Sequence, residues 1–264
     1  MTGTKPQLIT FGMSHYCEKA RWALDWHRVD YDEIGWPPGV HVILAKRCGA
    51  KDTTLPILLD GKRVIQGSDA IIDWADQQAQ DSSRRLTFAS AREIERRADD
   101  GVGINVRRLA YAEILPEAPH LAKPALFAKA SPLHRLIGNI MWPVTRKIMM
   151  KMYEIRPGAA QESRANLNVE LDWLDSLLAD GRQYLSDGRF SRADITVASL
   201  LGPFARPEQM KTYHNLAVPR ALTVDFECWK DRPIMRWIVE RYRTDRAANG
   251  LHHGPLPPPE HLSP

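Results

Sequence analysis

The chain is poor in cysteine and has no long apolar run. Cys17, Cys48 and Cys228 are its three cysteines among 264 residues, too few and too dispersed for a disulfide framework. An odd number leaves at least one thiol free, as is usual in a reducing compartment. Charged residues or proline interrupt every apolar stretch well before the roughly 20 residues that a membrane-spanning helix needs. We therefore expect neither a disulfide-rich secreted domain nor a membrane span.

Three further patterns are lacking. The first residues, MTGTKPQLITFG, show no charged segment followed by an apolar one, so we expect no signal peptide and a cytoplasmic protein. The net charge is +4, but basic residues alternate with acids, as in REIERRADD, which argues against nucleic-acid binding. No Cys-x-x-Cys or His-x-x-x-His pair occurs, so we expect no bound metal.

What is present is the composition of an ordinary globular protein. Apolar residues make up 44% of the chain and charged residues 26%. This length and balance favour two domains, each with a buried core.

The first part of the chain predicts alternating strands and helices. QLITF, from Gln7 to Phe11, has the pattern of a strand, and a helix with Ser14 at its start follows. VDYDEI supplies a second strand, followed by a short helix at 41–47. Two apolar runs around Asp60-Gly61 predict a hairpin, and Ser68 is expected to cap the next helix. This order is the thioredoxin-like arrangement.

The remainder predicts helices. A polar linker at 79–90 leads into a long helix that we expect to loosen at Gly101 and Gly103. We expect Pro143 to interrupt a later helix, and Ser191 and Asp194 to form a capping box. The predicted domains are therefore 1–80 and 91–246, the second all-helical, followed by a flexible tail at 247–264.

Four motifs together resemble the soluble glutathione transferase superfamily, in its serine- or cysteine-motif bacterial form. They are SHYCEKARWAL from Ser14, TLPILLDG from Thr54, GSDAI from Gly67 and FSRADITVASLL from Phe190. The resemblance implies an α/β thioredoxin-like domain that holds glutathione, followed by an all-α domain that binds the second substrate. It also implies a cytoplasmic detoxification enzyme. The enzyme would be a homodimer whose two copies contact each other through the first helices of the helical domain.

Ser14 and Cys17 are the candidate catalytic residues. Glutathione reacts as a thiolate, but a free thiol titrates near ~8.5, so a useful decrease is about two units or roughly 2.7 kcal/mol. A helix N-terminus contributes roughly 0.3–2 kcal/mol, and a hydroxyl that donates to the sulfur anion contributes on the order of 1.5–3 kcal/mol. Ser14 can supply both, although serine is also a common plain cap. Cys17 has the position of a small packing residue, with a nucleophilic thiolate as the alternative.

The resemblance also assigns the residues that hold glutathione. It implies a cis Pro56, with the main chain of Leu55 pairing with the tripeptide, and it places Ser68 at the γ-glutamyl carboxylate. The family's acidic residue before this serine is replaced here by Gly67, so Asp69 is the candidate for the γ-glutamyl amino group. Lys46 or Lys51 would have to meet the glycyl carboxylate.

The second substrate is expected to be a small hydrophobic electrophile bound between the domains. Candidate lining residues are Trp36, Pro37, Arg107, Arg108 and Tyr111. The methionine-rich segment at 134–153 could line that pocket or touch a membrane surface, but we favour a core or interface helix pair and expect no membrane contact.

Three functions therefore stand as hypotheses. The first is conjugation of the glutathione thiolate to a hydrophobic electrophile. The second is a glutathione-dependent thiol reductase that uses Cys17. The third is a non-catalytic ligand-binding or interaction module with the transferase fold. It is supported by Gly67 and by the lack of an obvious residue for the glycyl carboxylate just before Leu55.

Overall fold

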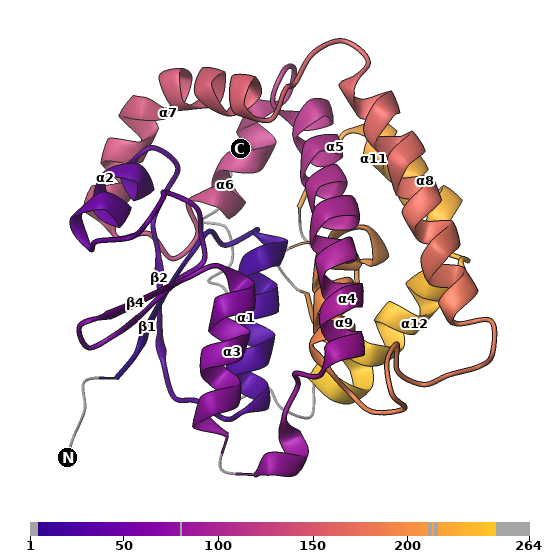
Figure 1. Ribbon diagram of the computed structural model, residues 1–264. Coiled ribbons are helices and arrows are strands. Elements are labelled where there is room, and N and C mark those ends of the chain that lie inside the picture. The colour runs from indigo at the N-terminus through magenta and orange to yellow at the C-terminus, as the bar shows by residue number, and fades with distance from the viewer. Residues whose placement is uncertain (1–4, 80, 211–212, 214–215, 247–264) are drawn as a thin grey trace.

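The computed structural model describes residues 5–79, 81–210, 213 and 216–246 (Figure 1). The tail expected at 247–264 lies outside the described residues. In the part of the chain that is described, no helix combines the length and the apolar character that crossing a bilayer requires.

A mixed sheet of four strands forms the first part of the fold. The strands are β1 (Gln7–Thr10), β2 (Asp32–Gly35), β3 (Ile57–Asp60) and β4 (Arg63–Gln66), in the order β2-β1-β3-β4. β1 pairs in parallel with β2, whereas the pairs β1–β3 and β3–β4 are antiparallel. The thioredoxin-like arrangement and the hairpin predicted at Asp60-Gly61 are confirmed.

Alternate residues of the strands face opposite sides of the sheet. Leu8 and Leu58 pack against helices α1 (His15–Trp26) and α3 (Ser68–Gln78). Ile9 and Ile57 instead join a cluster with Ala45 of α2 (Val40–Arg47). The sheet is thus covered on both faces, which explains the continuous apolar runs of β1 and β3.

The start of α3 differs from the sequence prediction. Gly67, not Ser68, is the N-cap, and Ser68 is the first helical residue. The reason is the backbone at Gly67, whose φ of 95° lies in a region that glycine adopts readily and other residues rarely do.

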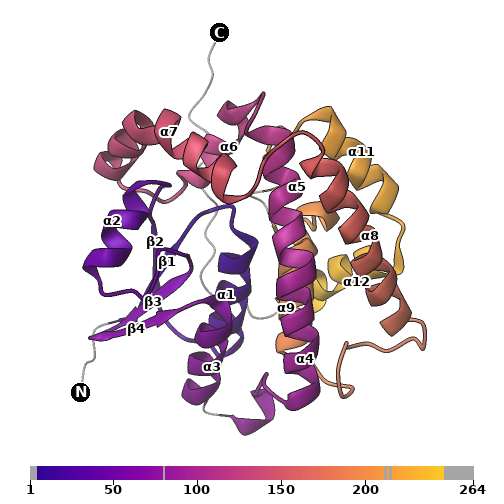
Figure 2. The ribbon, with the colours of Figure 1, turned by 45° about the horizontal axis from the view of Figure 1, so that its top comes forward.

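Helices make up the rest of the fold (Figure 2). The first runs continuously from α4 through a π-helical segment into α5. This wider segment contains Gly101 and Gly103, where the sequence predicts a loosened helix. A Cβ on Gly103 would lie 2.3 Å from the Tyr16 hydroxyl, so this glycine lets α1 approach closely. The helices are α4 (Ala89–Arg97), the π-helix Ala98–Gly103, α5 (Ile104–Ile114), α6 (Pro119–Leu126), α7 (Pro132–Met152), α8 (Ala159–Leu177), α9 (Arg192–Ala205), α11 (Arg220–Trp229), α12 (Pro233–Arg241) and the π-helix Tyr242–Arg246.

The prediction that Pro143 interrupts its helix is wrong, because α7 continues through it. Proline at this position removes the hydrogen bond to the carbonyl of Asn139. Both residues are exposed, so water can take the place of the lost donor.

The largest apolar core joins the two parts of the chain. Trp22 of α1 and Ile72 of α3 belong to the same buried cluster as Leu109, Leu171 and Ile195 of the helical part. Figure 2 shows α1 and α3 lying between the sheet and the helices α4, α5 and α9. Helix α1 is therefore packed against the sheet on one side and against the helical part on the other.

Asp194 forms the predicted capping box of α9. Its carboxylate accepts hydrogen bonds from the Ser191 amide at 2.8 Å and from the Ser191 hydroxyl at 2.6 Å. It also accepts a bond from the Leu185 amide at 2.8 Å, which ties the preceding loop to the helix.

The capping box gives a stability prediction. Asp194→Ala should lower the free energy of unfolding by about 3 kcal/mol, since it leaves buried N–H groups without an acceptor. Urea unfolding measures the change, with Asp180→Ala as the control because Asp180 pairs with Arg182 on the exposed surface. Equal effects of the two variants would contradict a special role for the box.

Candidate functional site

The topology brings three segments to one end of the sheet. Ile9 near the end of β1 pairs with Ile57 at the start of β3, and Ile57 pairs with Gln66 at the end of β4. The loop carrying Ser14, the Leu55-Pro56 pair and the start of α3 are therefore neighbours. The Gly67 amide donates to the Pro56 carbonyl at 3.0 Å, which fixes two of them together.

Ser14 is the N-cap of α1. Its backbone is extended, with φ −78° and ψ 120°, and its Oγ accepts a hydrogen bond from the Cys17 amide at 3.3 Å. In this bond the oxygen is the acceptor, so the hydroxyl proton can be donated either to the neighbouring Cys17 sulfur or to a bound anion. The amides of His15 and Tyr16, in the first turn, have no carbonyl four residues earlier within the helix. Ser14 is only half-buried, so a ligand can reach it.

Cys17 lies one turn into α1 and has no exposed surface. Burial raises the pKa of its thiol, and this effect outweighs the lowering by Arg21 and by the hydrogen bond with Ser14. A thiol in this state is protonated near neutral pH and is shielded from a substrate. The position is that of a packing residue.

The peptide bond between Leu55 and Pro56 is cis, as the resemblance implied. Leu55 is half-buried, and its amide and carbonyl make no main-chain hydrogen bond to any described residue. They are thus available to pair with an extended peptide.

Gln66 holds the loop before Leu55, a role that the sequence did not reveal. Its amide nitrogen donates to the carbonyls of Asp52 and Thr54, both at 3.0 Å, and to the Asp52 carboxylate at 2.8 Å. Asp52 in turn accepts the Thr54 amide at 2.7 Å. The approach to Leu55 is therefore fixed by a polar clamp from the end of β4.

The start of α3 presents Gly67, Ser68 and Asp69. Ser68 is buried in the first turn, where amide groups are unpaired within the helix. Asp69 is exposed, and its Oδ1 lies 2.7 Å from the point where a Cβ on Gly67 would be. A carboxylate therefore stands beside Gly67 even though that residue has no side chain.

Comparison with known families and structures agrees with this fold. Residues 8–83 match the model of the glutathione S-transferase N-terminal domain. Among curated proteins no match is found. The match covers the first, thioredoxin-like part of the chain, which is therefore similar to the N-terminal domain of glutathione S-transferases.

Solved structures with this fold cover nearly the whole chain. Glutathione transferase GSTFuA3 from Phanerochaete chrysosporium is 14% identical, with a TM-score of 0.64 over 96% of this chain and 100% of its own. Beta-etherase LigF from Sphingobium sp. strain SYK-6 is 17% identical, with a TM-score of 0.56 over 90% of this chain and 100% of its own. Glutathione transferase URE2P6 from Phanerochaete chrysosporium, in complex with oxidized glutathione, is 16% identical, with a TM-score of 0.55 over 91% of this chain and 97% of its own. At these identities the likeness shows the fold.

An aromatic cluster lies beside the start of α1 in this transferase fold. The Arg107 guanidinium lies 4.6 Å from the Tyr153 ring centre and 5.6 Å from that of Tyr16, and the rings of Tyr111 and Tyr153 are 5.1 Å apart. Arg107 Nε is buried without a hydrogen-bond partner among the described residues. Burial and the nearby Arg107 charge lower the pKa of His15 to about 3, so its ring is neutral.

The other expected lining residues lie elsewhere. Arg108 faces α8 and bonds Glu162 at 3.0 Å. Trp36 is buried in the apolar cluster beneath α2. Pro37 packs near Gly138 of α7. Of the proposed set, only Arg107 and Tyr111 belong to the aromatic cluster, because neighbouring positions on α5 point in different directions.

Tyr213 is a further residue at the site that no local sequence pattern indicates. Its hydroxyl donates to the carbonyl of Met13, the residue before Ser14. Burial raises the pKa of Tyr213, so the hydroxyl stays protonated and keeps this bond. The helical part thus anchors the loop that carries Ser14.

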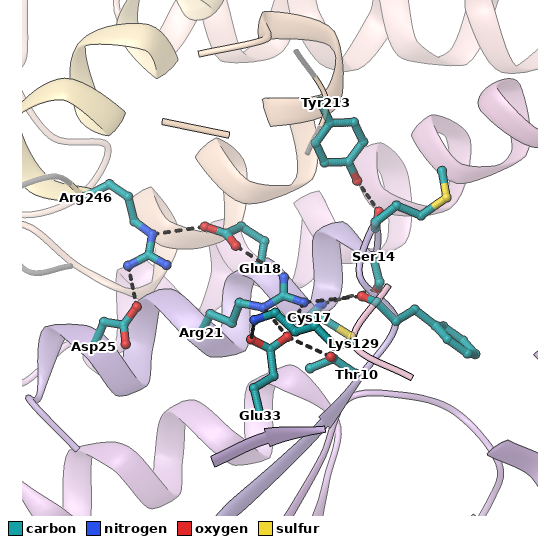
Figure 3. A network of polar contacts seen from close by, with 12 residues as sticks. Thr10, Ser14, Cys17, Glu18, Arg21, Asp25, Glu33, Lys129, Tyr213 and Arg246 are labelled. Atoms are coloured by element: carbon teal, nitrogen blue, oxygen red, sulfur yellow. Dashed lines mark hydrogen bonds and ion pairs between the residues drawn. The ribbon is translucent and has the colours of Figure 1, made fainter. Parts of the chain in front are cut away.

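A buried ionic network supports the same loop from beneath (Figure 3). Arg21 donates to Glu33 through Nη2 at 2.7 Å and through Nε at 2.9 Å, and to the Phe11 carbonyl at 3.3 Å. Lys129 also bonds Glu33, and Thr10 donates to it at 2.8 Å. Burial raises the pKa of Glu33, but Arg21 and Lys129 lower it by more, so the net pKa lies below the ordinary value.

Glu33 should therefore contribute to acid sensitivity. Because its folded-state pKa is depressed, its contribution to stability is present above the ordinary pKa of 4.5 and is lost as the pH falls below it. Glu33→Gln should cost about 3 kcal/mol near neutral pH, by leaving buried cations unpaired, and should flatten the loss of stability in acid. Urea unfolding across pH measures both, with exposed Glu208→Gln as the control. If the variant lost stability below pH 4.5 as steeply as the wild-type chain, Glu33 would not be held ionised in the folded protein.

Proposed function

We propose that the protein is a glutathione transferase that joins the glutathione sulfur to a hydrophobic electrophile. The observation that supports this most is the meeting of Ser14, the free main chain of Leu55 and the start of α3 at one end of the sheet. Together they offer a donor for sulfur, a main-chain edge for a peptide and a site for a carboxylate.

Ser14 would lower the pKa of the bound thiol. Its hydroxyl would donate to the sulfur anion of glutathione in place of the protonated Cys17 thiol, and the first-turn amides of α1 favour negative charge at the same place. The thiolate then attacks the electrophilic carbon, and the leaving group departs with the bonding electrons.

The two ends of the γ-glutamyl group would bind at α3. Unpaired amides of the first turn and Ser68 suit its carboxylate. In the resembled family, an acidic residue at the position of Gly67 binds the γ-glutamyl amino group. Here Asp69, whose carboxylate lies beside Gly67, would bind that amino group. Binding of glutathione to this chain is part of the proposal, and the complexed transferase URE2P6 supports it by likeness of fold.

The thiol reductase hypothesis finds less support. A reductase needs an accessible thiolate, whereas Cys17 is fully buried and its pKa is raised by that burial. Ser14, in contrast, is half-buried at the helix terminus.

Ser14→Ala tests the proposed chemistry. Loss of a hydrogen bond to a charged sulfur, worth about 1.5–3 kcal/mol, should lower kcat/KM by roughly 10- to 150-fold with a chloronitrobenzene acceptor. The ultraviolet thiolate band of the glutathione complex should shift to higher pH by about one to two units.

Cys17→Ala is the matched control for this experiment. It should leave conjugation essentially intact, whereas a reductase would lose its activity on a mixed disulfide. An unchanged rate and thiolate titration in Ser14→Ala would remove Ser14 from the mechanism. Failure of the wild-type chain to bind immobilised glutathione would instead favour a non-catalytic module.

Arg107 suggests a preference among second substrates. It lies between tyrosine rings near α1 and has no carboxylate partner among the described residues. An aromatic acceptor with a carboxylate would supply the counter-charge and stack on the rings. Arg107→Gln should raise KM for a chloronitrobenzoate about tenfold and leave a neutral chloronitrobenzene unchanged. Arg108→Gln, whose partner is Glu162, is the control, and an equal effect of both variants on the two acceptors would contradict this preference.

A further inference from the structure

Helix α7 exposes a continuous apolar stripe. Apart from the adjacent Leu136 and Ile137, its members recur every three or four residues, the spacing of one helical face, and each is between 36% and 73% exposed. They are Leu133, Leu136, Ile137, Ile140, Val144, Ile148 and Met152. With 21 residues, α7 extends this face over about 30 Å. Large apolar residues at this density mark an interaction site rather than ordinary surface.

The opposite face of α7 is already used in the fold. Gly138, Trp142, Thr145 and Met149 are its buried residues. Trp142 packs edge-on against Phe127, with ring centres 6.0 Å apart. In Figures 1 and 2 the helix lies along the rim of the molecule, beside α2 and α6. The stripe thus points away from the core and has no partner in the described part of the chain.

The charge around the stripe has one sign. Between Glu117 and Glu154 the sequence contains no aspartate or glutamate. Lys129 in this segment pairs with Glu33, and Arg146 donates to main-chain carbonyls. The others on α7, Arg135, Lys147 and Lys151, are exposed and pair with no carboxylate among residues 5–79, 81–210, 213 and 216–246. This contrasts with the rest of the surface, where ion pairs are frequent.

Neighbouring α2 continues the same character. It contains no acid, exposes Ile43, and carries exposed Lys46 and Arg47 in its last turn. An exposed apolar face with unpaired cations and no anions is typical of helices that lie in the interface of a membrane with anionic lipids.

We propose that α7 docks this protein on the surface of an anionic lipid bilayer, with the apolar stripe at the headgroup boundary and the lysines at the phosphates. This departs from the sequence expectation of no membrane contact and does not depend on the conjugation reaction. A second copy of the chain fits the face less well. A symmetric contact through the stripe would enclose Lys147 and Lys151 of both copies, and residues 118–153 supply no carboxylate to offset them.

Cosedimentation of the full chain with vesicles tests the proposal. Phosphatidylcholine vesicles that contain phosphatidylserine should bind the protein, pure phosphatidylcholine vesicles should bind it much less, and added salt should weaken binding. Each lysine should contribute about fivefold to partitioning of the protein onto the anionic vesicles. The double variant Lys147→Gln, Lys151→Gln should therefore reduce that partitioning about 25-fold. Lys62→Gln, in the exposed turn between β3 and β4, should have little effect.

The apolar stripe has its own matched pair of variants. Ile140→Asp should abolish binding to the anionic vesicles. Val169→Asp should not, because Val169 is an exposed apolar residue on α8, outside the stripe, with 62% of its surface accessible. Both positions are exposed, so circular dichroism should show an unchanged fold. Equal binding to both kinds of vesicle, or none to either, would overturn the proposal. So would a solution dimer that Ile140→Asp converts to monomers, since a second copy would then cover the stripe.

Discussion

Helix α1 is enclosed by the sheet on one side, by α9 on the other and by α3 alongside, and the fold must therefore neutralise the charges that α1 buries. Lys19, Arg21 and Asp25 are all buried, and an unpaired ion in such a place is costly. Lys19 meets Glu95 at 2.8 Å, Arg21 meets Glu33 at 2.7 Å, and Arg246 meets Asp25 at 2.6 Å. Buried pairs add less stability than apolar packing would, but loss of one partner costs about 3–5 kcal/mol. These pairs are thus obligatory once the charges are inside.

The partners of these charges come from distant parts of the chain, so the surroundings of α1 are complete only when those segments are in place. Glu33 belongs to β2, Glu95 to α4 and Arg246 to the last described segment. Arg21 also holds the Phe11 carbonyl, and Tyr213 holds that of Met13. The loop that presents Ser14 is consequently fixed from beneath and from above. In the proposed reaction, a hydroxyl fixed in this way would need little rearrangement to meet a developing sulfur anion.

Local patterns were sufficient to predict the elements of the fold and three of the site segments. The Asp60-Gly61 turn, the start of α1 at Ser14 and the box of Ser191 and Asp194 each depend on residues a few positions apart. Glu18 and Arg246, by comparison, are separated by 228 residues, and Tyr213 and Met13 by 200, so no window of the sequence contains both partners. The clamp by Gln66 spans only 12 to 14 residues, but it depends on how the loop before Leu55 folds back onto the end of β4, which no local pattern indicates. The sequence predicts Ser68 as the cap of α3 because serine is a favoured N-cap. The cap is Gly67 instead, because the backbone at position 67 adopts a conformation that glycine permits.

The same rule that explains α1 also explains why α7 is unusual. Inside the molecule each described charge on α1 is matched by a partner, and on most of the surface lysines and arginines lie beside acids. On α7 both relations fail, since apolar side chains face outward and Lys147 and Lys151 beside them have no carboxylate partner in the described part of the chain. A folded chain gains nothing from this arrangement by itself, because exposed apolar area and like charges each cost free energy. A surface that supplies both an apolar phase and negative charge would remove both costs at once, and the boundary of an anionic bilayer has these two properties.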